Sequence, residues 1–260
     1  MNTLSYIILF SLVGSVFSLV GGFVLLWQEA FARRISTYLI SFAAGTLIGA
    51  AFLDLLPESF ETLPSTNIAL YMVLVGFFTF FLIEQVLFKL HHHETEHSLA
   101  HEELASHAPS LGIAPKLLTI GDSLHNFLDG IAITAAFLID IPLGITTSLV
   151  VAAHEIPQEI GDFSIMIHAG WSKSKVVMWN LFAASMTIVG ALVTYVFRDS
   201  IEPFIGYLLA LTAGLFIYIG TVDLLPEITY LPSRKKMLLN ITIFFLGLGV
   251  VILATTFIEH

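Results

Sequence analysis

Eight apolar stretches alternate with short polar segments along the 260-residue chain. Each stretch is about 20 residues long or longer, which is the length that an α-helix needs to cross the hydrocarbon core of a membrane. The predicted helices cover residues 4–27, 36–56, 68–90, 115–139, 142–170, 174–197, 203–226 and 237–258. No basic residue and no convincing cleavage motif mark the first stretch as a signal peptide, so we expect an uncleaved helix. The pattern predicts an all-α polytopic membrane protein with a single transmembrane domain over residues 1–260.

Composition supports this class. Hydrophobic residues make up 57% of the chain, charged residues only 12%, and the mean hydropathy is +0.90, which exceeds what a soluble core needs. There is no cysteine, so any metal is bound through nitrogen and oxygen. The net charge is −10, and many of the acidic residues lie within apolar segments. We expect neither a nucleic-acid partner nor an organic cofactor.

The basic residues predict the orientation of the chain. Nine of the ten Lys and Arg residues fall in or beside every second loop, those after the first, third, fifth and seventh predicted helices. Because cytoplasmic loops carry the excess of Lys and Arg, both termini are expected on the extracytoplasmic side. A plasma (inner) membrane is the expected location.

An internal repeat joins the two halves of the sequence. Residues 44–58 read AGTLIGAAFLDLLPE, and residues 213–227 read AGLFIYIGTVDLLPE. Five helix boundaries separate the copies, so they should run in opposite directions, as in transporters built from inverted repeats. We therefore expect a 3+2+3 arrangement, with the first three and last three helices around the fourth and fifth. Alternatively, DLLPE is only a helix-end pattern in which proline ends the span.

If the repeats are inverted, their acidic residues would form an entrance gate on the outer side and an exit gate on the inner side. The expected gate residues are Asp54 and Glu58 outside, and Asp223 and Glu227 inside.

The fourth and fifth predicted helices carry two polar stripes at helical spacing. The first is Asp122, His125, Asn126 and Asp129; the second is His154, Glu155, Gln158, Glu159 and Asp162. An ionised residue near the bilayer centre costs about 2.5–3.5 kcal/mol. No Lys or Arg lies within the polar part of either helix to offset that cost. Protons, water or a cation must therefore do so, and histidines among carboxylates favour a cation of the zinc or iron class.

The helical rise places this chemistry near the bilayer midplane. His125 lies about 15 Å and His154 about 18 Å along their helices. Pro157 is expected to kink the fifth helix and to free backbone oxygen beside the ligands. Gly130 and Gly161 are expected to let the two helices approach each other closely.

Other interpretations remain open at this point. The polar residues could serve only to bond neighbouring helices. HEIPQ, residues 154–158, resembles the HExxH of a zinc protease, although Gln158 replaces the second histidine, so an intramembrane zinc metalloprotease is the alternative function. The His-rich cytoplasmic loop, residues 91–110, is either a solvated linker or a weak metal-binding tract, which also allows a non-transporting metal sensor. Its candidate ligands are His91, His92, His93, His97 and His101.

The two stripes also carry a family resemblance. HNFLDG, residues 125–130, and HEIPQEIGD, residues 154–162, resemble the signatures HNFxDG and HEXPHEXGD of one branch of the ZIP family of divalent-metal transporters. The eight spans, the outside termini and the His-rich loop are also similar to that family. The resemblance implies transport of zinc, with Fe²⁺, Mn²⁺ or Cd²⁺ as alternatives, toward the cytoplasm by alternating access. It also implies a homodimer.

The resemblance further implies which residues bind the metal. His125, Asp129, His154 and Gln158 match the main site. Asn126 and Glu155, with Asp129 shared, match an adjacent second site, and Glu159 and Asp162 belong to the same signature. Gln158 is a departure, because this branch usually carries histidine there, and a neutral amide is a weaker zinc ligand than imidazole.

Overall fold

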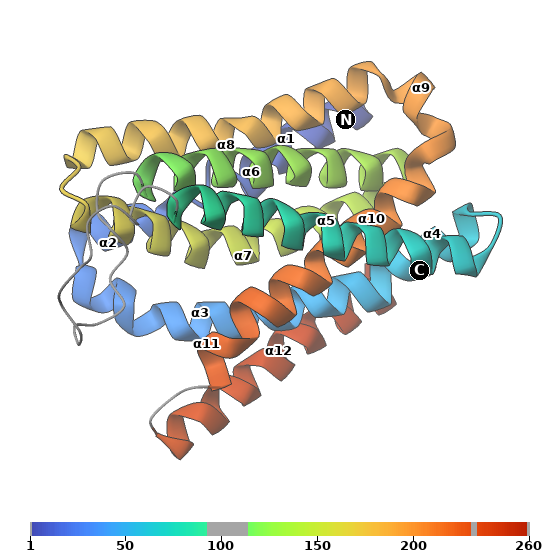
Figure 1. Cartoon of the computed structure of the whole chain (residues 1–260). Coiled ribbons are helices and arrows are strands. Elements are labelled where there is room, and N and C mark those ends of the chain that lie inside the picture. Colours follow the sequence, from blue (N-terminus) through green and yellow to red (C-terminus); the bar gives the residue numbers. More distant parts are fainter. Residues whose placement is uncertain (1, 93–113, 230–232, 259–260) are drawn as a thin grey trace.

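The computed structural model describes residues 2–92, 114–229 and 233–258, and these residues form helices joined by short turns, with no strand (Figure 1). The α-helices are α1 (Thr3–Gly14), α2 (Val20–Trp27), α3 (Glu29–Ala50), α4 (Leu56–Thr62), α5 (Thr66–His92), α6 (Ala114–Ile139), α7 (Ile141–His168), α8 (Lys173–Val196), α9 (Arg198–Ile201), α10 (Ile205–Tyr218), α11 (Leu225–Thr229) and α12 (Arg234–Ile258). Two π-helical segments, η1 (Ala51–Leu55) and η3 (Ile219–Leu224), and one 3₁₀ turn, η2 (Glu202–Phe204), connect some of them.

Several of these segments are long and apolar enough to cross a membrane. By length and composition there are five in the described part of the chain: Glu29–Thr62, Thr66–Gln85, Lys173–Val196, Arg198–Leu224 and Arg234–Thr256. The helices α6 and α7 are as long, at 26 and 28 residues, but contain the acidic stripes. These features agree with the predicted all-α membrane class.

The first predicted helix differs from the expectation of one continuous span over residues 4–27. It is interrupted after Gly14, and α2 begins only at Val20. In the turn, the Ser15 hydroxyl donates to the Ser11 carbonyl at 2.6 Å, and the Ser18 hydroxyl donates to the Ser15 carbonyl. The interruption lets α2 pack closely on α7, since a Cβ at Gly21 would lie 2.3 Å from the Ile156 carbonyl oxygen.

The two copies of the repeat adopt the same unusual local structure. In each copy an α-helix changes to a π-helical segment, η1 or η3, that contains the aspartate, Asp54 or Asp223. A short α-helix then follows, with proline near its start. A proline ring clashes with the carbonyl four residues earlier, so widening the turn before Pro57 and Pro226 relieves that clash. DLLPE therefore marks a π-helical segment in each copy, and not only the end of a helix.

Close glycine contacts hold α3 against α12. A Cβ at Gly45 would lie 2.0 Å from the carbonyl oxygen of Phe244, and one at Gly247 would lie 2.3 Å from that of Phe42. Only glycine allows two helix backbones to approach so closely, because any side chain would overlap the facing carbonyl.

The pair of α5 and α10 repeats this arrangement. A Cβ at Gly214 would lie 2.1 Å from the Val73 carbonyl oxygen, and one at Gly76 would lie 2.1 Å from that of Leu211. In the aligned repeat, Gly214 corresponds to Gly45 and Leu211 to Phe42. Figure 1 shows α3 and α10 running in roughly opposite directions. The two copies thus pack against their partner helices through the same positions.

The expectation for Gly130 and Gly161 was wrong. A Cβ at Gly130 would lie 2.0 Å from the carbonyl oxygen of Thr187 in α8, so this glycine serves the contact of α6 with α8. Gly190 of α8 makes the reciprocal contact with α6, at 2.2 Å from the Phe127 carbonyl oxygen. Nothing lies within 4 Å of a Cβ at Gly161. The contact between α6 and α7 is therefore made by side chains, among them the polar stripes.

Candidate metal centre

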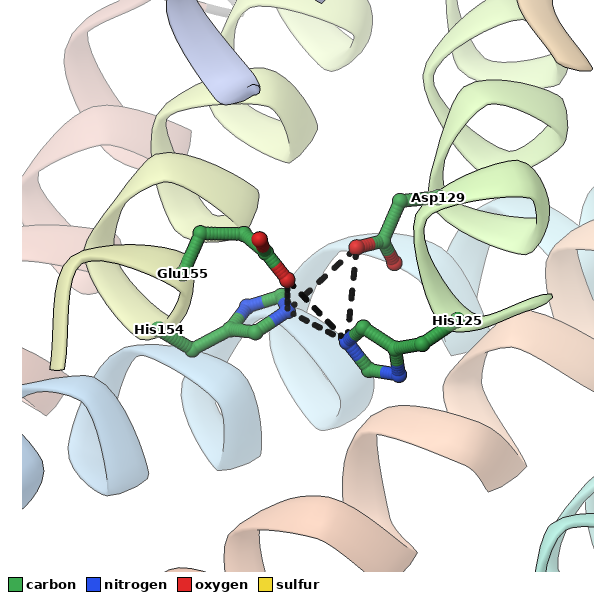
Figure 2. A group of neighbouring side chains, drawn as sticks. All are labelled: His125, Asp129, His154 and Glu155. Carbon is green, nitrogen blue, oxygen red and sulfur yellow. Dashed lines mark hydrogen bonds and ion pairs between the residues drawn. The ribbon is translucent and has the colours of Figure 1, made fainter. Parts of the chain in front are cut away.

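Four side chains from α6 and α7 meet in the interior. His125 and Asp129 come from α6, and His154 and Glu155 from α7, and one ligand atom of each lies within 4.8 Å of the others (Figure 2). We call this group the four-residue centre. His125 and Asp129 converge because residues four apart share one face of a helix. A single residue, Asp140, separates α6 from α7, so the chain reverses there and α7 runs back beside α6. The polar stripes of the two helices therefore lie next to each other.

The distances within the four-residue centre suit a small tetrahedral ion. The two Nε2 atoms of His125 and His154 are 3.2 Å apart. Asp129 Oδ2 lies 3.5 Å from each of them, and Glu155 Oε1 lies 3.4 Å from His125 Nε2 and 3.8 Å from His154 Nε2. Ligands at about 2.0–2.2 Å from a tetrahedral zinc ion are about 3.3–3.6 Å from one another. Five of the six distances among the four atoms thus lie at or near the spacing that a zinc ion requires.

The orientation of His154 favours the same chemistry. Its Nδ1 donates to the Val150 carbonyl oxygen at 3.1 Å, one turn earlier in α7. A carbonyl can only accept, so Nδ1 carries a proton, which leaves Nε2 as the ring nitrogen that a metal ion would bind. Such a hydrogen bond from the second ring nitrogen is typical of metal-binding histidines.

The two carboxylates are buried without hydrogen-bond donors. Asp129 and Glu155 are both 0% exposed, and among the described residues neither accepts a hydrogen bond on either oxygen. Phe80 and Phe216 pack edge-on against the rings of His125 and His154 and shield the site. Buried anions without donors are costly, and a divalent cation between them would remove that cost.

Two predicted ligands with amide side chains, Asn126 and Gln158, are hydrogen-bonded to Asp122. The Asn126 amide donates to Asp122 Oδ1 at 2.9 Å and accepts from the Thr187 hydroxyl at 2.7 Å. The Gln158 amide donates to the same Asp122 oxygen at 3.1 Å. Among the acids and histidines of the described residues, Glu155 joins His125, Asp129 and His154 in the group of four. Asp122 was part of the predicted stripe but was not expected to organise its neighbours.

Glu159 and Asp162 lie further along α7. They are 1% and 6% exposed, and neither Glu159 oxygen accepts a hydrogen bond from the described residues. The charges that act on Glu159 are those of Asp122, Asp162 and Glu155. Glu159 is therefore a buried acid in acidic surroundings, one turn beyond Glu155 on α7.

The predicted gate residues occupy different environments. Asp54 in η1 is 3% exposed, whereas Glu58 and Asp223 are partly exposed. Asp223 interacts electrostatically with His125 and with Glu84 of α5. Glu84 accepts a hydrogen bond from the Tyr218 hydroxyl and was not expected from the sequence, although an acid within an apolar helix is itself a signal.

The side chains of the remaining predicted residues are outside the described part of the structure. The side chain of Glu227 in α11 lies outside the described residues, as do the side chains of His91 and His92 at the end of α5. His93, His97 and His101 belong to the undescribed segment 93–113.

Comparison with known proteins agrees with these features. The family model for the ZIP zinc transporter matches residues 3–112 and 89–255. The zinc transporter foi of Drosophila melanogaster is 38% identical over 167 residues, which cover 62% of this chain and 23% of the fly protein. The human zinc transporter ZIP4 is 37% identical over 132 residues, covering 51% of this chain and 20% of its own.

A fungal relative aligns over more of the chain. An uncharacterized zinc transporter of Schizosaccharomyces pombe is 29% identical over an alignment of 283 residues. The alignment includes 84% of this chain and 62% of the relative. The matched segments thus span less than two thirds of each of these relatives.

Proposed function

Because the chain belongs to the ZIP zinc transporter family, we propose that it carries zinc across a membrane and that the four-residue centre is its main metal site. The observation that carries this proposal is the convergence of two imidazole nitrogens and two carboxylate oxygens within 4.8 Å in a buried place. This mixed nitrogen and oxygen set is typical of zinc. Fe²⁺, Mn²⁺ and Cd²⁺ are the competing substrates, and competition uptake would rank them.

Zinc would cross the membrane by alternating access. In this mechanism α6 and α7 move as one unit against two inverted three-helix repeats in a 3+2+3 arrangement of eight spans. The matching glycine contacts of α3 with α12 and of α5 with α10 join the first repeat to the second, and they support a single rigid body made of these four helices. A π-helical segment beside each gate aspartate supports bending at those places.

The direction of transport would be toward the cytoplasm. The ion would enter past Asp54 and Glu58, lose water at the four-residue centre near the bilayer midplane, and leave past Asp223 and Glu227. The electrostatic interaction of Asp223 with His125 supports the second half of this path, because the ion would meet an acid directly after the centre. Both termini would be extracytoplasmic, in a plasma membrane. By its family the protein would act as a homodimer.

A protease function is not favoured. A zinc hydrolase keeps one metal position open for water and uses the glutamate of its motif as a base. Here Glu155 is one of the four groups around the centre, and Gln158 is hydrogen-bonded to Asp122. The family match likewise favours a transporter over an enzyme.

The test is zinc uptake into liposomes that contain the purified protein. His125→Ala and Asp129→Ala should each abolish uptake. His168→Ala is a matched control, because His168 is an exposed histidine whose Nδ1 donates to the Ser164 carbonyl at the end of α7. Uptake that persists in both centre variants would overturn the site, and a wild-type protein that moves no divalent metal would overturn the function.

A further inference from the structure

A network of hydrogen bonds joins α6, α7 and α8 through Asp122. The Thr187 hydroxyl of α8 donates to Asn126 Oδ1 at 2.7 Å, and the Asn126 amide donates to Asp122 Oδ1 at 2.9 Å. The Gln158 amide of α7 donates to the same Asp122 oxygen at 3.1 Å. We call these four residues the Asp122 network. Asp122 and Asn126 belong to α6, so the network connects α6 to both of its neighbours.

The direction of the bonds around Asn126 is fixed. The Asn126 amide nitrogen also donates to the Asp122 backbone carbonyl at 3.1 Å, and a carbonyl can only accept. Asn126 Oδ1 therefore faces the Thr187 hydroxyl, which donates to it. Asn126 and Thr187 are 0% exposed and Asp122 is 5% exposed, so bulk water is kept from these bonds. Buried bonds that each pair a donor with an acceptor hold their members in one arrangement.

The network lies at a particular place along the two site helices. Asp122 is 18 residues before Asp140 and Gln158 is 18 residues after it, so each is about 27 Å along its helix from the turn. The two ligands that each helix gives to the four-residue centre fall between the turn and the network. The pair of α6 and α7 is thus joined covalently on one side of the centre and by the bond of Gln158 to Asp122 on the other.

The empty centre opposes this pairing of α6 with α7. Asp129 of α6 and Glu155 of α7 are both 0% exposed, and neither accepts a hydrogen bond from the described residues. Two carboxylates repel each other strongly where the dielectric constant is low, so they oppose the approach of the two helices when no ion lies between them. The close glycine contact of α6, at Gly130, is with α8 and not with α7. A contact that needs no metal is therefore required to keep α7 in place.

We propose that the Asp122 network holds α6 against α7 while the four-residue centre is empty, so that Asp122 and Gln158 are positioning residues for the metal ligands. They act through the spacing of the two helices and not as ligands. The imidazole and carboxylate atoms, which are 3.2–3.8 Å apart, are then in place before an ion arrives. Binding to such a preorganised site costs less ordering, which raises the affinity.

The network gives the amide at position 158 a role. The related signature carries histidine there, and an amide is a weaker zinc ligand than imidazole. The amide is nonetheless a hydrogen-bond donor at every pH, which suits it to hold the Asp122 carboxylate. The positioning role rests on the proposed function, because it requires that the centre binds zinc. The connection between α6 and α7 does not, and it can be measured in metal-free protein.

The experiment measures the distance between α6 and α7 with and without zinc, on the purified chain in detergent. The chain has no cysteine, so Ile120→Cys in α6 and Ile165→Cys in α7, both at exposed positions, provide two unique sites for spin labels. Double electron–electron resonance then reports the distance. Without further substitutions, the same narrow distribution should be seen in both states. With Asp122→Leu, the metal-free distribution should broaden and move to longer distances, and zinc should restore it.

Matched variants separate hydrogen bonding from charge. Asp122→Asn keeps an oxygen that can accept from both amides, so it should keep the narrow metal-free distribution although the charge is lost. Thr187→Ser keeps the hydroxyl that holds Asn126, whereas Thr187→Val removes it, so only the second should broaden the distribution. Gln158→Leu should act as Asp122→Leu does, and its zinc affinity should fall about three- to tenfold, the range expected for one buried hydrogen bond.

Three results would overturn the proposal. An unchanged metal-free distance in Asp122→Leu would show that the network does not hold the helices together. If Asp122→Asn were as disruptive as Asp122→Leu, the charge would matter and not the hydrogen bonds. A distance that zinc does not restore would show a structural role without positioning of the ligands. If the distances are as expected but the wild type takes up no zinc, only the proposed function is overturned.

Discussion

The glycine-packed helix pairs and the pair of site helices, α6 and α7, are held together by different kinds of contact. The pairs α3 with α12 and α5 with α10 meet backbone to backbone, at positions where a single methyl group would overlap a carbonyl. The helices α6 and α7 meet through buried imidazoles and carboxylates, several of which have no hydrogen-bond donor among the described residues. The first kind of contact packs backbone against backbone, and the second brings charged groups together without hydrogen-bond donors, a cost that a bound cation would remove.

This difference separates two kinds of substitution. Changes at the packed glycines should destabilise the fold and leave the metal chemistry in place. Changes at the buried acids should remove the metal chemistry and leave the metal-free fold as stable as before, or more stable. If one set of substitutions did both, the division between scaffold and site would be wrong.

The largest effect is expected from neutralising the centre. Asp129→Asn combined with Glu155→Gln should reduce zinc uptake at least about 100-fold, because both anionic ligands are lost. Without metal, the apparent Tm of this variant should equal or exceed that of the wild type, since two buried carboxylates that accept no hydrogen bond from the described residues are gone. Zinc at 100 times its Kd should stabilise the wild type by about 2.7 kcal/mol and the variant not at all. A lower Tm in the metal-free variant would show that the acids stabilise the fold.

A second effect should appear at the scaffold glycines. Gly45→Ala should cost about 1–3 kcal/mol, because its Cβ forces α3 away from α12. Gly214→Ala at the equivalent position of the other repeat should cost about as much. Gly249→Ala is the control within α12, as a Cβ there meets nothing within 4 Å. Thermal unfolding measures all three, and equal Tm values for Gly45→Ala and Gly249→Ala would contradict the packing account.

The same contrast exists on the site helices. Gly130→Ala should destabilise, because its Cβ would lie 2.0 Å from the Thr187 carbonyl oxygen. Gly161→Ala should be neutral or stabilise by up to about 1 kcal/mol, as is usual for replacing an unhindered glycine in a helix. Loss of stability in Gly161→Ala would mean that α7 packs against a surface that the described residues do not include.

A smaller effect is expected at Gln158. Gln158→Ala removes one hydrogen bond to Asp122 but no group of the four-residue centre. A hydrogen bond to a charged group contributes about 1.5–3 kcal/mol. Its loss should mainly affect the Asp122 carboxylate, which does not belong to the four-residue centre. The zinc affinity of the centre should therefore fall less than about tenfold. Equilibrium dialysis with zinc measures this. A loss as large as that of His154→Ala would restore Gln158 as a direct ligand.

The smallest effect is expected from the His-rich loop. Deleting residues 93–108 should change zinc uptake by less than about twofold, because a polar histidine tract binds metal only weakly. Liposome uptake measures it. A complete loss of the metal response after this deletion would favour the metal-sensor alternative.

The helical class and the chemistry of α6 and α7 followed from residue spacing alone. His125 with Asp129 and His154 with Glu155 were placed on facing stripes by helical periodicity, which depends only on local geometry. The partners of Asn126, Gln158 and Gly130 were not predictable in that way. Contacts with a second helix depend on how the two helices are rotated against each other, and Thr187 of α8, which contacts Asn126 and Gly130, is 61 residues from Asn126.

The sequence also did not predict where the helices are interrupted. Nothing in the hydropathy pattern separates α1 from α2, since the residues of the turn are as apolar as their neighbours. Pro57 and Pro226 did mark their segments, yet the π-helical turns before them depend on how each helix resolves the proline clash. The repeat was detectable because its residues are alike, whereas the shared packing of Gly45 and Gly214 is seen only in the structure.

The measurement that tests the central claim most directly is X-ray absorption at the zinc edge on protein loaded with one equivalent of zinc. The account predicts four nitrogen and oxygen neighbours at about 2.0–2.2 Å, two of them with the scattering pattern of imidazole. His154→Ala should reduce the imidazole count to one. A spectrum without imidazole, or one that His154→Ala leaves unchanged, would contradict the assignment of zinc to the four-residue centre.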